Sequence, residues 1–205
     1  MSLEQILIPD SIRDVRLPSS AEKLIDEAND RIEAFMLADQ KVIENFVTCD
    51  FWLAAQALCW IEEQHLLTGD RFLEFGSGFG VAAMLAALRG MEAVGIEIEP
   101  ELVDQASSLA DDLSLDAKFF AGSFVPRDTS GLIEAFSDVR HVETEEGDVY
   151  DEIGLELEDF DLFFAYPWPG EHTFFEAVFE SGAPVGSMLL TYRGREGMNL
   201  VRKTA

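Results

Sequence analysis

Three glycines at alternate positions follow a short apolar segment, and an acidic residue stands two positions before the first of them. The stretch FLEFGSGFG, residues 72–80, contains Glu74, Gly76, Gly78 and Gly80. Glycines with this spacing let a backbone turn lie directly against a ligand. A second acidic residue, Glu97, ends the stretch AVGIE, and a carboxylate can accept hydrogen bonds from two adjacent hydroxyls. These residues predict a ligand site where the backbone of the turn and carboxylate groups contact the bound molecule.

Other ligands of glycine-rich turns fit less well. A P-loop needs a lysine after its glycines, and none follows here, which excludes nucleoside triphosphate hydrolysis. The dinucleotide pattern G-x-G-x-x-G/A fits only from Gly78, through Gly80 and Ala83, two residues later than a tight turn after a strand requires. A nucleotide-dependent oxidoreductase therefore stays as a weaker alternative, as does a tight turn that binds nothing.

Alternating strand and helix patterns surround this turn. We expect strands over 71–75, 92–98, 117–122, 159–166 and 186–192, with a short last strand over 199–205. We expect helices over 19–38, 51–64, 78–89, 100–113, 130–139 and 171–180. Apolar strands separated by helices predict a doubly wound, mostly parallel α/β sheet of the Rossmann type, whose ligands bind at the carboxyl ends of the strands.

The chain is expected to form a single domain over 1–205. Residues 1–66 would be an N-terminal helical cap, and residues 67–205 the ligand-binding α/β core. Little chain remains after the fifth expected strand, so the C-terminal strand region should be shortened. The N-terminal helices or a second subunit, in a homo-oligomer, would then cover the sheet edge.

Composition narrows the classes of partner. With 40 acidic and 14 basic residues the net charge is −26, which disfavours nucleic acids and membrane surfaces as partners. The scattered histidines His65, His141 and His172 have no metal-ligand spacing. Neither a signal peptide nor a membrane span is predicted, so we expect a cytoplasmic protein. Residues 141–161 contain ten acidic residues and either form a solvated connection or disfavour anionic acceptors.

The glycine turn resembles motif I of class I S-adenosylmethionine-dependent methyltransferases, [DE]-x-G-x-G-x-G, from Glu74 to Gly80. The resemblance implies S-adenosylmethionine as the cofactor, with Glu74 supporting its methionine end. It also implies that Glu97, with Glu99 as a rival, accepts the ribose hydroxyls. The implied cofactor contacts are Glu74, Gly76, Ser77, Gly78, Gly80, Glu97, Ile98, Ser123 and Tyr166. Ser123 stands where the family commonly has an aspartate against the adenine.

The stretch Tyr166-Pro167-Trp168-Pro169 stands where the family's motif IV belongs, but it departs from the usual [DNS]-P-P-[YFW] pattern. It would still give a rigid, electron-rich wall near the methyl group. We interpret Tyr166, Trp168 and His172 as acceptor-side candidates and name no general base. The resemblance implies a methyltransferase that acts on a small-molecule or protein acceptor. A non-catalytic S-adenosylmethionine-binding protein remains the alternative, because the C-terminal region is short.

Overall fold

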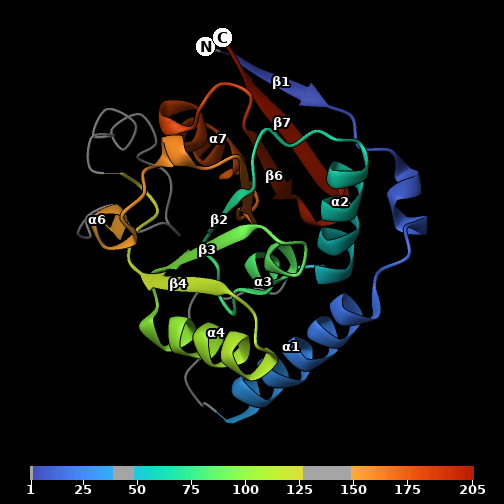
Figure 1. Cartoon of the computed structure of the whole chain (residues 1–205), viewed down its shortest axis with the longest axis vertical. Helices are drawn as coiled ribbons and strands as arrows, with labels where there is room; N and C mark the ends of the chain where they lie inside the picture. Colours follow the sequence, from blue (N-terminus) through green and yellow to red (C-terminus); the bar gives the residue numbers. More distant parts are fainter. Residues whose placement is uncertain (1, 39–48, 127–148) are drawn as a thin grey trace.

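The computed structural model describes residues 2–38, 49–126 and 149–205, which form one seven-stranded sheet between two helical layers (Figure 1). The strands lie in the order β1-β7-β6-β5-β2-β3-β4. Their bounds are β1 Ser2–Ile6, β2 Arg71–Phe75, β3 Glu92–Glu97, β4 Ala117–Ala121, β5 Leu162–Ala165, β6 Met188–Tyr192 and β7 Met198–Thr204. The helices are α1 Ser19–Ala38, α2 Phe51–Glu63, α3 Val81–Ala87, α4 Pro100–Leu113, α6 Val149–Ile153 and α7 His172–Gly182. Short 3-10 turns span Asp10–Asp14, Leu157–Asp159 and Gly194–Glu196.

The parallel centre of the sheet agrees with the sequence-based fold. Strands β6, β5, β2, β3 and β4 pair in parallel, and β2 and β5 are buried on both faces. Runs such as RFLEF and LFFA suit this position, because a strand covered by helices on both sides needs apolar residues at every step. The predicted doubly wound, Rossmann-like architecture is confirmed.

The antiparallel edge differs from the prediction. Strand β7 pairs with β6 in antiparallel fashion, and the N-terminal strand β1 pairs with β7, from Ser2 opposite Thr204 to Ile6 opposite Leu200. The first residues of the chain therefore form the outermost strand, which the expected N-terminal helical cap over 1–66 did not include. The β7 edge, which we expected the N-terminal helices or a second subunit to cover, is paired with β1 instead, and a homo-oligomer stays a prediction.

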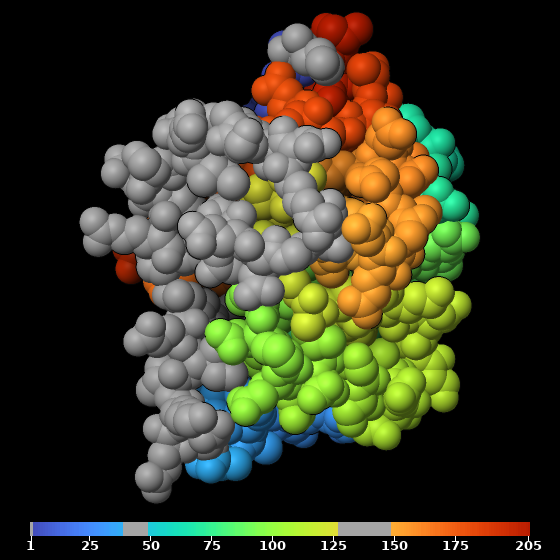
Figure 2. Space-filling view, turned by 90° about the vertical axis from the view of Figure 1, so that its left-hand side faces the viewer, coloured from blue at the N-terminus to red at the C-terminus, as the bar shows by residue number. Residues whose placement is uncertain are grey.

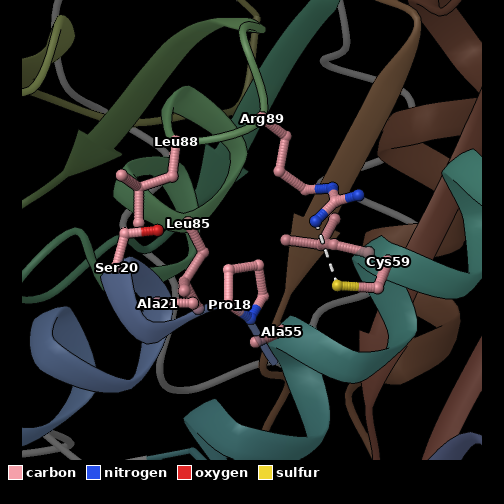
Figure 3. Close-up of a pocket in the computed structure, with 9 residues that line it drawn as sticks. Pro18, Ser20, Ala21, Ala55, Cys59, Leu85, Leu88 and Arg89 are labelled. Carbon is pink, nitrogen blue, oxygen red and sulfur yellow. Dashed lines mark hydrogen bonds between the residues drawn. The ribbon is translucent and has the colours of Figure 1, made fainter. Parts of the chain in front are cut away.

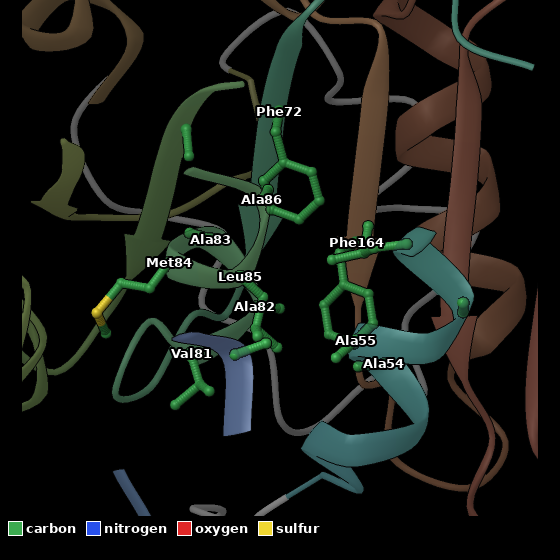
Figure 4. Packing of buried hydrophobic residues seen from close by; sticks show 14 of the residues in the cluster. Ala54, Ala55, Phe72, Val81, Ala82, Ala83, Met84, Leu85, Ala86 and Phe164 are labelled. Atoms are coloured by element: carbon green, nitrogen blue, oxygen red, sulfur yellow. The ribbon is translucent and has the colours of Figure 1, made fainter. Parts of the chain in front are cut away.

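Two separate cores lie on the two faces of the sheet. Side chains from α1, α2 and α3 pack on one face, where Phe72 and Phe164 lie against small residues of α2 and α3 (Figure 4). Six consecutive buried residues of α3, VAAMLA, let this helix approach the sheet closely. Phenylalanines of β5 and α7 dominate the other face, with Phe163 against Phe179 at 5.0 Å between ring centroids.

Most of the predicted helices are confirmed. Helices α1 and α4 have the predicted bounds, and Met36 near the end of α1 is 60% exposed. Cys49 lies before the predicted helix 51–64 and precedes α2. The predicted helix 130–139 lies outside the described residues. Within the described ranges, no helix is both long and apolar enough to cross a membrane.

Candidate functional site

The glycine turn lies at the carboxyl edge of the sheet, directly after β2. Its three glycines have positive φ angles of 66° at Gly76, 53° at Gly78 and 68° at Gly80. The amide of Ser77 donates to the carbonyl of Ile96 on β3 at 2.9 Å, and the amide of Gly80 donates to the carbonyl of Ser77 at 2.7 Å. These bonds tie the turn to the neighbouring strand and explain why residues without a Cβ stand at the left-handed positions.

Two of these glycines have opposite surroundings. A Cβ added at Gly80 would collide with the ring of Phe119 on β4. A Cβ added at Gly76 would meet no atom within 4 Å. Packing therefore requires the glycine at position 80, whereas the space beside Gly76 is open to a ligand.

Glu97 ends β3 and reaches across to the glycine turn. It is 8% exposed, and its Oε2 accepts a hydrogen bond from the amide of Gly78 at 2.7 Å while its Oε1 accepts from the amide of Glu99 at 3.1 Å. Burial raises the pKa of Glu97, and the backbone amides oppose this rise. Each carboxylate oxygen has two lone pairs, so the group that fixes the turn can still accept the hydroxyls of a ribose. Glu99 is exposed and makes no capping bond to α4, which favours Glu97 over its rival.

Glu74 lies below the turn, on the α3 face of β2. It is 5% exposed, and its Oε2 accepts a hydrogen bond from the amide of Ala83 at the start of α3, at 2.8 Å. Burial raises the pKa of Glu74 to about 8, and the nearby Glu97 adds to this rise. The acid therefore holds α3 against β2 and is easily protonated, and a cation close to it would favour its ionised form.

The remaining predicted cofactor contacts on this side lie along the same edge. Ile98 follows Glu97 and is half-buried. Ser123 follows β4 and is buried, and its Oγ accepts a hydrogen bond from the amide of Val125 at 3.2 Å. The Oγ of Ser77 is buried against Gly95 and has no hydrogen-bond partner among the described residues. Positions 74–80, 97–98 and 123 thus converge at the ends of three adjacent strands.

Tyr166 lies on the other side of β2, just after β5. Its half-buried ring packs against Tyr192 at the end of β6, with 4.9 Å between the centroids and 53° between the planes. Burial raises the pKa of both phenols. Sequence reasoning missed Tyr192, although an aromatic residue that closes a strand adjacent to the site was a usable signal.

Two residues before α2 also lie close to this pair. Asp50 caps α2 by accepting the amide of Leu53 at 3.0 Å. Burial raises the pKa of the Cys49 thiol, and the charges of Glu74 and Asp50 raise it further. The fold therefore brings Cys49 near Tyr166 and Tyr192, although it belongs to none of the motifs described above.

The other two acceptor-side candidates belong to the connection from β5 to α7. Trp168 is half-buried, and its carbonyl accepts the amide of Glu171 at 2.9 Å. His172 is half-buried and begins α7. Both lie past the carboxyl end of β5, as predicted from the sequence, and their chemical roles stay predictions.

The face beyond β4 is formed by α4 and the segment that contains α6, which lie next to each other in the space-filling view (Figure 2). Tyr150 of α6 is buried and donates a hydrogen bond to the carbonyl of Phe124 at 2.7 Å. Residues 149–161 of the acidic segment 141–161 are described, and α6 within them contacts β4. The part before Val149 lies outside the described residues.

A second hollow lies far from this edge, between α1, α2 and α3 (Figure 3). Its volume is about 30 Å³, room for one or two waters and far too little for a nucleoside. Arg89 borders it, donating to the sulfur of Cys59 at 3.0 Å and forming an ion pair with Glu62. This hollow is a packing feature of the helical layer.

Comparison with known proteins agrees with this geometry. The sequence profile of the protein-L-isoaspartate(D-aspartate) O-methyltransferase family matches residues 4–123. Ribosomal protein L11 methyltransferases match over shorter stretches. The protein of Thermus thermophilus is 37% identical over 71 residues, and that of Ralstonia pickettii is 34% identical over 77 residues. These matches span 35% and 37% of the chain but only 26% of each relative.

Solved structures show the same fold. An O-methyltransferase from Bacillus cereus aligns with 88% of this chain and 69% of its own, at a TM-score of 0.50 and 15% identity. A hypothetical protein from Thermus thermophilus aligns with 82% of this chain and 93% of its own, at a TM-score of 0.51 and 17% identity. At these identities the likeness concerns the fold.

Proposed function

The chain belongs to the protein-L-isoaspartate(D-aspartate) O-methyltransferase family, and on this premise we propose that it is an S-adenosylmethionine-dependent methyltransferase. The observation that carries the proposal is the glycine turn between two buried acids, Glu74 and Glu97, with open space beside Gly76. A turn of this kind suits a ligand with a cationic end and a ribose. It does not suit a pyrophosphate, which a carboxylate would repel.

The residues of the chain would hold the cofactor along three strand ends. Glu97 accepts the ribose hydroxyls through the lone pairs that Gly78 and Glu99 leave free. The backbone at Gly76 lies against the methionine part, and Glu74 supports the ammonium end. Ile98 and Ser123 border the adenine. The methyl group then faces β5, where Tyr166 begins the connection to α7.

Methyl transfer from a sulfonium is an in-line displacement, so the protein contributes mainly by positioning the two reactants. Bound S-adenosylmethionine supplies the electrophilic methyl group. The chain supplies the fixed turn on one side and the aromatic residues Tyr166 and Trp168 on the other. The acceptor is a small molecule or a protein. The relatives named ribosomal protein L11 methyltransferase favour a protein acceptor. The net charge of −26 disfavours a nucleic acid as acceptor.

Binding of the demethylated cofactor, S-adenosylhomocysteine, tests the first half of the proposal. Calorimetry should give a micromolar affinity, and NADH should not bind. Gly76→Ala should weaken binding at least tenfold because the added methyl group occupies the ligand's space. Gly90→Ala is the matched control: its φ is 84° and its Cβ also meets no atom within 4 Å, but it lies after α3, away from the turn. Both variants should lose about 1 kcal/mol of stability.

Glu97→Ala should cost about 1–3 kcal/mol of cofactor binding, because a buried pair of hydroxyls loses its acceptor. The variant also frees two backbone amides, so its free energy of unfolding should fall as well. Calorimetry on the folded fraction separates the two losses. Tighter binding of NADH than of S-adenosylhomocysteine by the wild-type protein would instead support the oxidoreductase alternative. Cofactor binding without transfer to any acceptor would support a binding protein.

A further inference from the structure

The tyrosine pair is placed by strand register. Ala165 of β5 pairs in parallel with Thr191 of β6, so the next residues, Tyr166 and Tyr192, lie side by side. Strand alternation directs both rings to the face that carries α2, because Phe164 and Leu190, two residues earlier, belong to the core on that face. The pair therefore lies across β2 from Glu97, on the side where the methyl group would face.

The polar ends of the pair are unused. Within the described part of the chain, neither the Tyr166 hydroxyl nor the Tyr192 hydroxyl has a hydrogen-bond partner in the protein, although both rings are half-buried. A buried phenol normally finds a partner. The rings and their hydroxyls are thus available to a bound molecule.

The charge beside the pair is negative. Burial raises the pKa of the Tyr192 phenol, and the charge of Asp50 raises it further, which places this carboxylate near the pair. The amino end of α2 carries about half a positive charge. Asp50, which caps that end, carries a full negative charge, so the net charge at this end of the helix is negative. A carboxylate acceptor would meet repulsion here, whereas a group that becomes cationic would be stabilised.

The acceptor half also lies outside the family match. That match ends at residue 123, before β5, β6 and both tyrosines. The isoaspartyl oxygen named in the family's description is therefore not implied for this chain by the residues that match.

We propose that Tyr166, Tyr192 and Asp50 form the acceptor subsite and that it takes an amine, an assignment that rests on the proposed function. The amine first loses its proton to water. Its nitrogen lone pair then attacks the methyl carbon, and the carbon–sulfur bond breaks with its electron pair staying on sulfur. The products are a methylated ammonium and S-adenosylhomocysteine. Positive charge moves from sulfur to nitrogen during the transfer, and the ring faces and Asp50 stabilise it at its destination.

The test uses tritiated S-adenosylmethionine and two pentapeptides that differ at one position. One contains lysine and a free amino terminus, and the other contains isoaspartate with blocked ends and no amine. The lysine peptide should acquire label that survives mild alkali. Tyr192→Ala should lower kcat/KM for the lysine peptide at least tenfold. Tyr192→Phe should keep at least half of the wild-type kcat/KM because the ring remains. The affinity of both variants for S-adenosylhomocysteine should change less than twofold.

Asp50→Asn should lower kcat/KM about threefold to tenfold, since asparagine still caps α2 but carries no charge. Asp104→Asn, which changes an exposed carboxylate on α4, is the control and should leave the rate unchanged.

An unlabelled lysine peptide, or alkali-labile label in the isoaspartyl peptide, overturns the amine assignment. So does a loss in Tyr192→Phe as large as in Tyr192→Ala, because the hydroxyl and not the ring would then be needed. If the wild-type protein fails to bind S-adenosylhomocysteine, the proposed function fails instead.

Discussion

The two halves of the carboxyl edge are built in different ways. At the ends of β2 and β3, positive-φ glycines and buried acids form one half of the candidate site, and backbone amides hold both acids in place. At the ends of β5 and β6 the site consists of aromatic side chains whose hydroxyls have no partner in the described chain. The first half is rigid and defined by a short local motif. The second depends on the pairing of β5 with β6, which brings together two tyrosines that share no sequence motif.

The largest expected effect is a loss of folding in the glycine half. Gly80→Ala adds a methyl group at a φ of 68° and drives it into the ring of Phe119. The left-handed backbone costs about 1–2 kcal/mol and the overpacking about 1–3 kcal/mol more. Urea denaturation should show both losses, whereas Gly90→Ala, with the same backbone strain and open space, should show the first alone. Equal losses of stability in the two variants would mean that β4 moves to make room for the methyl group and that this half is less rigid than the contacts indicate.

The sequence was sufficient for elements with strong local signals. Helix α4 was predicted with its observed bounds because Pro100 favours its first turn and an apolar stripe runs through it. The glycine turn and Glu97 were recognised as candidates because each stands in a short motif at the end of a predicted strand. The buried strands β2 and β5 were identified by continuous apolar runs between turn residues.

Elements that depend on distant partners were missed. Strand β1, with the sequence SLEQI, has only five residues and no clear alternation, and its partner β7 lies at the opposite end of the chain. The proximity of Tyr192 and Asp50 to Tyr166 has the same cause, since neither belongs to a motif that contains Tyr166. Local propensity cannot specify such contacts, because tertiary pairing decides them.

An intermediate effect is expected from the buried acid in the cofactor half. Glu74 has a pKa of about 8 in the folded protein against 4.5 ordinarily, so between these values the folded state holds a proton that the unfolded state releases. The stability gained from protonated Glu74 is complete below pH 4.5 and is lost as the pH rises towards 8. Glu74→Gln does not titrate and keeps an oxygen for the amide of Ala83.

The variant should therefore equal the wild type near pH 5 and exceed its stability near pH 8, by on the order of 2 kcal/mol. Urea denaturation at pH 5, 6, 7 and 8 measures the difference, with the exposed Glu101→Gln on α4 as the control. Parallel stability curves for wild type and Glu74→Gln would show that water or a cation already compensates the buried acid.

The smallest expected effect comes from the acceptor half. Trp168 is half-buried between Pro167 and Pro169, on the connection that leaves β5 at the carboxyl edge. The prolines restrict the backbone on both sides, so the indole is held at little entropic cost. Trp168→Ala should therefore lower methyl transfer about tenfold, equivalent to ~1.4 kcal/mol of transition-state stabilisation, while calorimetry gives an unchanged affinity for S-adenosylhomocysteine. The outcome separates the two halves directly, because a variant on the acceptor side should leave the cofactor side intact. A protein that unfolds but retains full activity per folded molecule would place Trp168 in the core and would leave Tyr166 and Tyr192 as the aromatic wall.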